Sequence, residues 1–229
     1  MSKKISYLTQ IIQFSRNFIK MLKNPAGERN KQPILEILQQ YVDVNKESRL
    51  LEISSGCGLH SSFLSSYFPM TSFQPSECDV NLFKSIKAYT KDCRNVKEPI
   101  LIDISKDHES WDSAYEGQLL KSSTNIFEYM LNINMIHITP FECTEGLFKN
   151  SSKLLKSKGL LFTYGPYSMN NVLTPESNVL FDKSLRSKDP SWGIRDICDL
   201  KLLAEKNSMD LLKIHDLPSN NKLLVWIKN

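Results

Sequence analysis

A carboxylate and two glycines near residue 55 suit a ligand that carries an amine. Glu52 is followed by Ser54, Gly56 and Gly58. Glycine permits positive φ and lets a ligand lie on the backbone, while the N–H groups that open the next helix face that ligand. We therefore expect Gly58→Val to block the ligand and leave the fold intact. The alternative for this stretch is an ordinary turn between a strand and a helix.

Further acids stand at the ends of two other expected strands. Glu77 lies about 20 residues beyond the glycines, where nucleotide-binding α/β folds place a carboxylate that accepts both ribose hydroxyls. Asp79 is the second candidate for this contact, although it also suits the cap of the next helix. Asp103 ends a third strand, where it either accepts from an adenine amine or caps the following loop.

Polar residues from scattered segments are expected to meet at the same edge of the sheet. Asn134 and His137 follow a fourth strand and Tyr167 a fifth, and open α/β sheets bind ligands at the carboxyl ends of their strands. Arg29 and Asn30 precede a helix that must pack on this sheet. A histidine in such a pocket can serve as a general base near neutral pH. The alternative is a hydrogen-bonded histidine in the pocket wall.

The elements that must position these residues alternate as in an α/β protein. Apolar runs predict seven strands, and the turn at 218–221 makes the last two an antiparallel hairpin on a mostly parallel sheet with helices on both faces. Pro33 and Asn30 predict a first turn and a cap for the first core helix. The expected strands are 50–53, 71–74, 99–104, 125–131, 160–164, 210–217 and 222–228, and the expected helices include 34–41, 59–68, 140–156 and 196–206.

An insertion between residues 167 and 192 is too long for a simple connection. Segments of this length often form a lid or a wall of a substrate pocket. We therefore expect a substrate pocket that includes His137, Tyr167, Ser177, Asn178, Trp192 and Arg195.

Composition limits the function. The 229 residues suit one α/β domain, and 29 basic against 25 acidic residues leave a net charge of +4, which does not indicate nucleic acid binding. The five cysteines are too widely spread to predict a zinc site or a disulfide framework, and they resemble reduced intracellular thiols. No apolar run approaches the roughly 18 residues of a membrane span.

Residues 1–24 differ from the rest of the chain. Their apolar residues fall on one helical face with lysines and an arginine around them, which predicts a basic amphipathic accessory helix. A mitochondrial presequence or a membrane-surface helix is the alternative. The break at residues 24–27 places the main domain at 25–229, and we expect deletion of residues 1–24 to leave ligand affinity and melting temperature nearly unchanged.

Many sequence blocks together resemble one family. They include Leu-Leu-Glu-Ile-Ser-Ser-Gly-Cys-Gly-Leu-His, Phe-Gln-Pro-Ser-Glu, Asn-Met-Ile-His-Ile, Tyr-Gly-Pro-Tyr and Trp-Gly-Ile-Arg-Asp. In order over about residues 26–229, they are similar to the family of methyltransferase-like protein twenty-six, whose bacterial members carry a domain-of-unknown-function label. The resemblance implies a class I methyltransferase Rossmann-like fold and S-adenosylmethionine as cofactor.

The same resemblance implies roles by position. Glu77 stands where members typically have the shorter aspartate. Arg29, Asn30, His137 and Tyr167 match blocks with no established role. The positions that match the cofactor site are Glu52, Ser54, Gly56, Gly58, Glu77, Asp103 and Asn134. We also count Arg29 and Asn30 among the cofactor-binding candidates, because an arginine there favours the methionine carboxylate of the donor or an anionic group on the substrate.

These features predict an S-adenosylmethionine-dependent methyltransferase with a small-molecule acceptor, His137 as the catalytic candidate and an intracellular, cytoplasmic location. The Asn-Pro-Pro-Tyr type of motif for planar nitrogens is absent after the fourth strand. One alternative is a protein that binds the cofactor without turnover. A nicotinamide oxidoreductase is disfavoured by Ser61, which replaces the third glycine of G-x-G-x-x-G, and by the terminal hairpin.

Overall fold

A computed structural model describes residues 21–229. Most of the amphipathic helix predicted over residues 1–24 lies outside these residues, and residues 21–24 have no regular secondary structure. Leu22 is nevertheless held in place, because its N–H donates to Ser85 Oγ at 3.1 Å and its carbonyl accepts from the Tyr89 hydroxyl at 3.0 Å. The chain is therefore attached to the domain before the first described helix begins.

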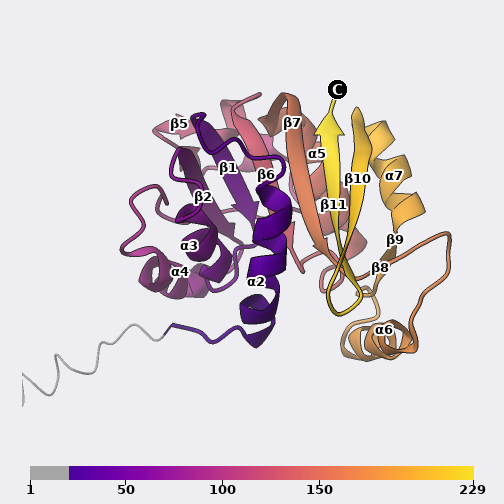
Figure 1. Ribbon diagram of the computed structural model, residues 1–229. Helices are drawn as coiled ribbons and strands as arrows, with labels where there is room; N and C mark the ends of the chain where they lie inside the picture. Colours follow the sequence, from indigo (N-terminus) through magenta and orange to yellow (C-terminus); the bar gives the residue numbers. More distant parts are fainter. Residues whose placement is uncertain (1–20) are drawn as a thin grey trace, which may run out of the picture.

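One seven-stranded sheet forms the centre of the molecule, in the order β10-β11-β7-β6-β1-β2-β3 (Figure 1). Only β11 runs antiparallel to its neighbours, so the predicted class of sheet and its closing hairpin are confirmed. The strands are β1 (Ser48–Ile53), β2 (Thr71–Glu77), β3 (Ile100–Leu101), β6 (Phe127–Ile133), β7 (Leu155–Gly165), β10 (Met209–Leu217) and β11 (Asn221–Lys228). Two small pairs lie outside it, β4 (Ala114–Tyr115) with β5 (Gln118–Leu119) and β8 (Tyr167–Ser168) with β9 (Arg195–Asp196).

Helices cover both faces of the sheet, as the sequence predicts. Buried side chains of α2 and α3 pack on one face, and those of α5 and α7 pack on the other. The helices are α2 (Pro25–Leu38), α3 (Leu59–Ser65), α4 (Phe83–Thr90), α5 (Phe141–Leu154), α6 (Glu176–Lys188) and α7 (Ile197–Lys206), with 3-10 turns at Val80–Leu82, His108–Ser110 and Leu120–Ser122. In Figure 1, α6 lies below the sheet, away from both layers.

Residues along one strand contribute alternately to the hydrophobic cores on the two faces of the sheet. On β11, Leu223 and Val225 join the cluster under α2 and α3, while Leu224 and Trp226 join the cluster under α5 and α7. Successive side chains of a strand point to opposite faces, so a strand in the middle of a three-layer domain is apolar throughout. The four residues are fully buried.

The first core helix begins earlier than the sequence predicts. The Asn24 side chain caps it by accepting from the Gly27 N–H at 2.8 Å, and Pro25 occupies the first helical position, where a missing N–H costs nothing. The predicted boundary at Asn24 is therefore a helix start. Asn30 is a buried residue inside α2, not its cap, and Pro33 lies in the helix interior.

Two strand lengths also differ from the prediction. The third strand is reduced to two residues, because the Asp103 side chain accepts from Ser105 and closes a turn directly after it. The fifth strand is longer, since α5 ends at Leu154 and the chain extends at once along Leu155–Gly165.

Candidate functional site

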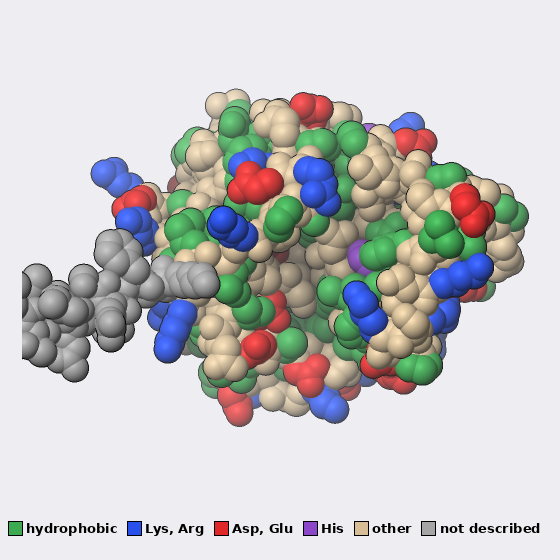
Figure 2. All heavy atoms as spheres, turned by 90° about the horizontal axis from the view of Figure 1, so that it is seen from below, with side chains coloured by type: hydrophobic (Ala, Val, Ile, Leu, Met, Phe, Trp, Pro, Cys, Tyr) green, Lys and Arg blue, Asp and Glu red, His purple; other side chains and the backbone are tan. Residues whose placement is uncertain are grey.

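A cavity of about 1050 Å³ opens at the carboxyl ends of the parallel strands. Figure 2 shows this face of the molecule with a hollow at its centre. The lining residues come from the loops after β1, β2, β6 and β7, from α2 and α6, and from the β10–β11 turn. They include Arg29, Asn30, Glu52, Ser54, Gly56, Glu77, Asn134, His137, Ser177 and Asn178.

The loop after β1 brings its backbone to the cavity through left-handed conformations. Ser54 and Gly56 both have φ of 58°. A β-carbon at Gly56 would meet no atom within 4 Å, so this glycine borders open space. Gly58 has φ of 93°, but a β-carbon there would lie 2.7 Å from Ile86 Cα. Gly58 therefore serves the packing of α4, and the expectation that Gly58→Val leaves the fold intact is wrong.

Glu52 lies at the base of the cavity and is 1% exposed. Burial raises the pKa of its carboxyl group to about 7, although the hydroxyls of Ser61 and Ser55 oppose the shift, and nearby Glu77 adds to it. Ser61 Oγ donates directly to Glu52 Oε2. A cationic ligand stabilises the ionised form of such a buried carboxyl, because its positive charge compensates for the lost hydration.

Glu77 links the end of β2 to the glycine loop. Its Oε2 accepts from the Gly56 N–H at 2.9 Å, and its Oε1 accepts from the Cys78 N–H at 2.8 Å. The side chain is buried but lines the cavity. The longer glutamate therefore reaches back to the loop, and its carboxylate stands beside the open space at Gly56.

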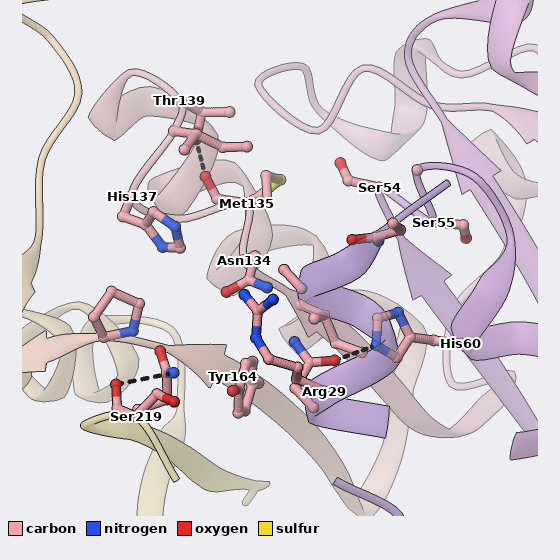
Figure 3. Close-up of a pocket in the computed structure, with 18 of the residues that line it drawn as sticks. Arg29, Ser54, Ser55, His60, Asn134, Met135, His137, Thr139, Tyr164 and Ser219 are labelled. Atoms are coloured by element: carbon pink, nitrogen blue, oxygen red, sulfur yellow. Dashed lines mark hydrogen bonds between the residues drawn. The ribbon is translucent and has the colours of Figure 1, made fainter. Parts of the chain in front are cut away.

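Asn134 and His137 lie together after β6 (Figure 3). Asn134 has φ of 63°, and its N–H donates to the Tyr164 carbonyl at 2.9 Å, so the loop is tied to the end of β7. Burial lowers the pKa of His137 to about 4, and the positive charge of Arg195 adds to this effect. The imidazole is therefore neutral at pH 7.

A second histidine, which the sequence analysis did not single out, also lines the cavity. His60 Nε2 lies 2.7 Å from Asn30 Oδ1, and both side chains are buried (Figure 3). Burial lowers the pKa of His60 to about 4, with a smaller effect from Lys31. Arg29 is exposed on the same turn of α2 and points toward Asn134 and Tyr164 in Figure 3.

The predicted insertion provides one wall of the cavity. Ser177, Asn178 and Phe181 line it from α6, and the Phe181 ring meets the His137 ring edge to face with centroids 5.6 Å apart. The β10–β11 turn closes this side, because Asn220 Nδ2 donates to Ser177 Oγ at 3.3 Å. The lining residues of the turn are Pro218, Ser219, Asn220 and Asn221.

Several predicted site residues lie outside the lining of this cavity. Tyr167 packs into the core under α5 and α7, because its short strand pairs with β9 and turns its ring to that face. Trp192 belongs to the turn after α6, and its backbone N–H donates to the Asp189 carbonyl at 3.0 Å. The expectation that Tyr167 joins the polar pocket is wrong.

Arg195 and Asp103 also lie outside the cavity lining, and each makes hydrogen bonds that hold a nearby loop. The Arg195 guanidinium donates to the carbonyls of Thr139 at 2.9 Å and Ser191 at 2.8 Å. It supports the segment around His137 from behind and acts on the cavity through its charge. Asp103 holds its own turn through Ser105.

Two lining residues, Tyr164 and His60, are not among the site residues predicted from the sequence. Tyr164 is the last residue of the expected fifth strand and was not named as a site candidate, yet it borders the cavity. His60 is the second residue of α3, and the available signal was its polar ring among apolar and small residues. Alternation along β7 places Tyr164 on the α2 side, and this pattern was the available clue.

The part of the chain between residues 21 and 229 offers neither a cluster of metal ligands nor a helix suited to a membrane. No three His, Cys, Asp or Glu side chains in this part gather as metal ligands. None of its helices combines the length and apolar character that a bilayer crossing requires.

Solved structures share the architecture. An O-methyltransferase family protein from Burkholderia thailandensis has a TM-score of 0.71 at 11% identity, over 89% of this chain and 57% of its own. The S-adenosylmethionine-dependent methyltransferase SibL has a TM-score of 0.65 at 12% identity, over 86% of this chain and 55% of its own. A protein from Pyrococcus horikoshii has a TM-score of 0.66 at 15% identity, over 95% of this chain and 99% of its own. The chain thus spans little more than half of the first two proteins.

A sequence profile covers nearly the whole described chain. The family described as Protein of unknown function (DUF938) matches residues 21–228. The structural likeness shows a class I methyltransferase Rossmann-like fold, and the profile shows the family. The chain therefore belongs to the DUF938 family.

Proposed function

We propose that this protein is an S-adenosylmethionine-dependent methyltransferase that acts on a small molecule. The observation that carries the proposal is the joint position of Glu52, the open backbone at Gly56 and Glu77 around one cavity. We also propose that the family is the one of methyltransferase-like protein twenty-six, whose blocks the sequence resembles.

The residues present fit the proposed donor. A buried carboxyl whose pKa is raised to about 7 suits the cationic methionine end. The open face at Gly56 admits a ligand against the backbone, and the Glu77 carboxylate beside it suits vicinal hydroxyls. We call these residues, with Ser54 and Asn134, the donor half of the cavity. Whether the exposed carboxylate of Asp103 reaches the adenine amine stays a prediction.

The proposed acceptor lies between His137 and α6. Bound S-adenosylmethionine supplies an electrophilic methyl group, and the protein's task is to hold a nucleophile in line with it. His137, neutral at pH 7, has a lone pair that can take the nucleophile's proton. We call His137, Ser177, Asn178, Phe181 and the turn at 218–221 the acceptor wall.

A small acceptor fits the size and the lining. A cavity of about 1050 Å³ accommodates a donor and a modest acceptor, since ligand pockets commonly span ~300–1,000 Å³. The acceptor wall carries hydroxyl, amide and aromatic groups and no charged side chain. The O-methyltransferase family protein among the structural relatives is consistent with an oxygen acceptor.

The cysteines support an intracellular location as part of the proposal. All five are free, which suits a reducing compartment.

Calorimetry tests the proposed cofactor. We expect S-adenosylmethionine and S-adenosylhomocysteine to bind and NAD not to bind. Binding of NAD alone would favour a nicotinamide oxidoreductase and contradict the proposal.

Incubation with labelled donor in a metabolite extract, followed by mass spectrometry, tests turnover. A labelled product that is lost in His137→Ala supports the enzyme. Tight donor binding without any labelled product would favour the alternative, a binding protein without turnover.

A further inference from the structure

Arg29, Asn30 and Tyr164 bring hydrogen-bond donors to one corner of the cavity. Arg29 and Asn30 are neighbours on α2, and Tyr164 is close to the end of β7. All three line the cavity. Between residues 21 and 229 the Arg29 guanidinium has no carboxylate partner, whereas Lys31 two residues on pairs with Glu28 at 2.5 Å. A cation at a cavity edge without an internal partner is available to an anionic ligand.

His60 fixes the direction of the Asn30 amide. An amide oxygen accepts and does not donate, so the 2.7 Å contact requires the proton on His60 Nε2. The ring is neutral at pH 7, because burial lowers its pKa to about 4. With its oxygen held by His60, Asn30 presents its NH₂ group to the other side. A buried amide with one end fixed in this way is a preoriented donor.

Tyr164 adds a hydroxyl whose surroundings favour donation to a ligand. Its ring packs in the core under α2 and α3, which fixes the position of the hydroxyl. Burial raises the pKa of this hydroxyl, while Asn30 and Arg29 act in the opposite direction. The Asn30 amide and the Arg29 charge thus act on the Tyr164 oxygen, and no internal acceptor within residues 21–229 takes its proton. The proton is free for an oxygen atom in the cavity.

We propose that Arg29, Asn30 and Tyr164 form a carboxylate-binding subsite, with His60 as its positioning residue. A guanidinium, an amide NH₂ and a hydroxyl match the acceptor oxygens of a carboxylate, and charge-assisted bonds of this kind are the strong ones. This inference rests on the proposed function. The carboxylate belongs to the methionine part of the donor or to the acceptor, and the experiment separates the two sources.

The first arm compares ligands with and without the carboxylate. The probes are S-adenosylmethionine and decarboxylated S-adenosylmethionine, with methylthioadenosine to report on the adenosine part. If the donor's carboxylate is bound, the wild type prefers the intact donor by about 10- to 100-fold, and Arg29→Met and Tyr164→Phe reduce the preference to about twofold. Lys31→Met removes a neighbouring charge outside the lining, so it is the matched control and leaves the preference unchanged.

The second arm tests the acceptor as the source. Protein saturated with S-adenosylhomocysteine is titrated with benzoate. If the acceptor's carboxylate is bound, benzoate binds the wild type and Lys31→Met, and its binding is lost in Arg29→Met. If the wild type shows neither a carboxylate preference nor benzoate binding, the subsite is overturned. Failure of every adenosine compound to bind would instead contradict the proposed function, so the two failures are distinguishable.

His60 is tested through a ratio that a purely structural role would not change. We expect His60→Leu to lower whichever carboxylate effect the wild type shows by about 10-fold and to leave methylthioadenosine affinity within about twofold. His60→Gln, which keeps a donor for Asn30, should recover part of the loss. Equal losses for all ligands in His60→Leu, without recovery in His60→Gln, would overturn the positioning role.

Discussion

The donor half and the acceptor wall of the cavity are built in different ways. In the donor half, Glu77 accepts a hydrogen bond from the Gly56 N–H and Ser61 donates one to Glu52. Its groups come from the ends of the neighbouring strands β1, β2 and β6. In the acceptor wall, a hydrogen bond from the Asn220 side chain to Ser177 joins the β10–β11 turn to α6. Phe181 is still 40% exposed there. The donor half is therefore fixed by hydrogen bonds to backbone and buried groups, whereas the two segments of the acceptor wall are joined by a hydrogen bond between exposed side chains.

The two glycines after β1, one in the donor half and one beneath α4, offer the largest expected effect. Gly56→Ala places a methyl group in the open cavity and should weaken S-adenosylmethionine binding by on the order of 100-fold, or about 2.7 kcal/mol. Gly58→Ala carries a similar penalty for positive φ, but its methyl group meets Ile86, so we expect a loss of about 1–3 kcal/mol in stability with a smaller change in affinity. Calorimetry and urea unfolding of both variants measure the difference. The reverse pattern would remove Gly56 from the ligand surface.

The two acids after β2 allow a comparison within the donor half. Glu77→Ala removes the acceptor of the Gly56 N–H and the proposed ribose contact, and we expect about 10- to 100-fold weaker donor binding. Asp79→Ala is the matched control, because Asp79 is exposed and caps a 3-10 turn. Its donor affinity should stay within about twofold of the wild type. A loss confined to Asp79→Ala would show that the ribose contact was assigned to the wrong acid.

Stability as a function of pH tests the buried carboxyl. The folded pKa of Glu52 is raised from 4.5 to about 7, so its contribution to stability is fully present below pH 4.5 and is lost as pH rises through 7. Glu52→Gln should therefore gain up to about 3 kcal/mol relative to the wild type between pH 4 and pH 8. His60 and His137, with pKa values lowered to about 4, act in the opposite sense and lose stability as pH falls from 6.5. They are the same in both proteins, so the difference isolates Glu52. Parallel curves for the two proteins would contradict a raised pKa.

The acceptor wall should give the smallest effect on the donor. Phe181→Ala removes the edge-to-face contact with His137, which is worth about 0.5–1.5 kcal/mol. We expect donor affinity within about twofold of the wild type and a several-fold lower yield of labelled product. Leu180→Ala, on the same helix and outside the lining, is the control. A large loss of donor affinity in Phe181→Ala would mean that the two parts of the cavity are not separate.

The donor half was largely predictable because its signals are local. Glu52, Gly56 and Glu77 lie on consecutive strand ends, and parallel strands bring such ends together by necessity. The sheet was predictable for the same reason, since β-hairpin and strand periodicities act over short distances. The lengths of β3 and β7 were not predictable. The Asp103 side chain closes a turn that ends β3 early, and β7 is long because it begins directly where α5 ends.

The acceptor side required information that the sequence pattern does not contain. Tyr167 and Tyr164 are three residues apart and both aromatic, but only the pairing of β8 with β9 decides that Tyr167 enters the core. Asn30 looked like a cap because Pro33 resembled a first-turn proline, whereas Asn24 and Pro25 start the helix two turns earlier. A pairing distant in sequence therefore decided the position of Tyr167, whereas a second cap signal six residues before Asn30 decided where the helix begins.

The contact between Asn220 and Ser177 also bears on how the protein is made. Residues 218–221 follow every other lining segment in the chain, so they leave the ribosome after the donor half and α6. A nascent chain that has emerged only as far as α7 already contains Glu52, Gly56 and Glu77 but lacks one side of the acceptor wall. The acceptor wall is therefore the part of the cavity that is completed last during synthesis.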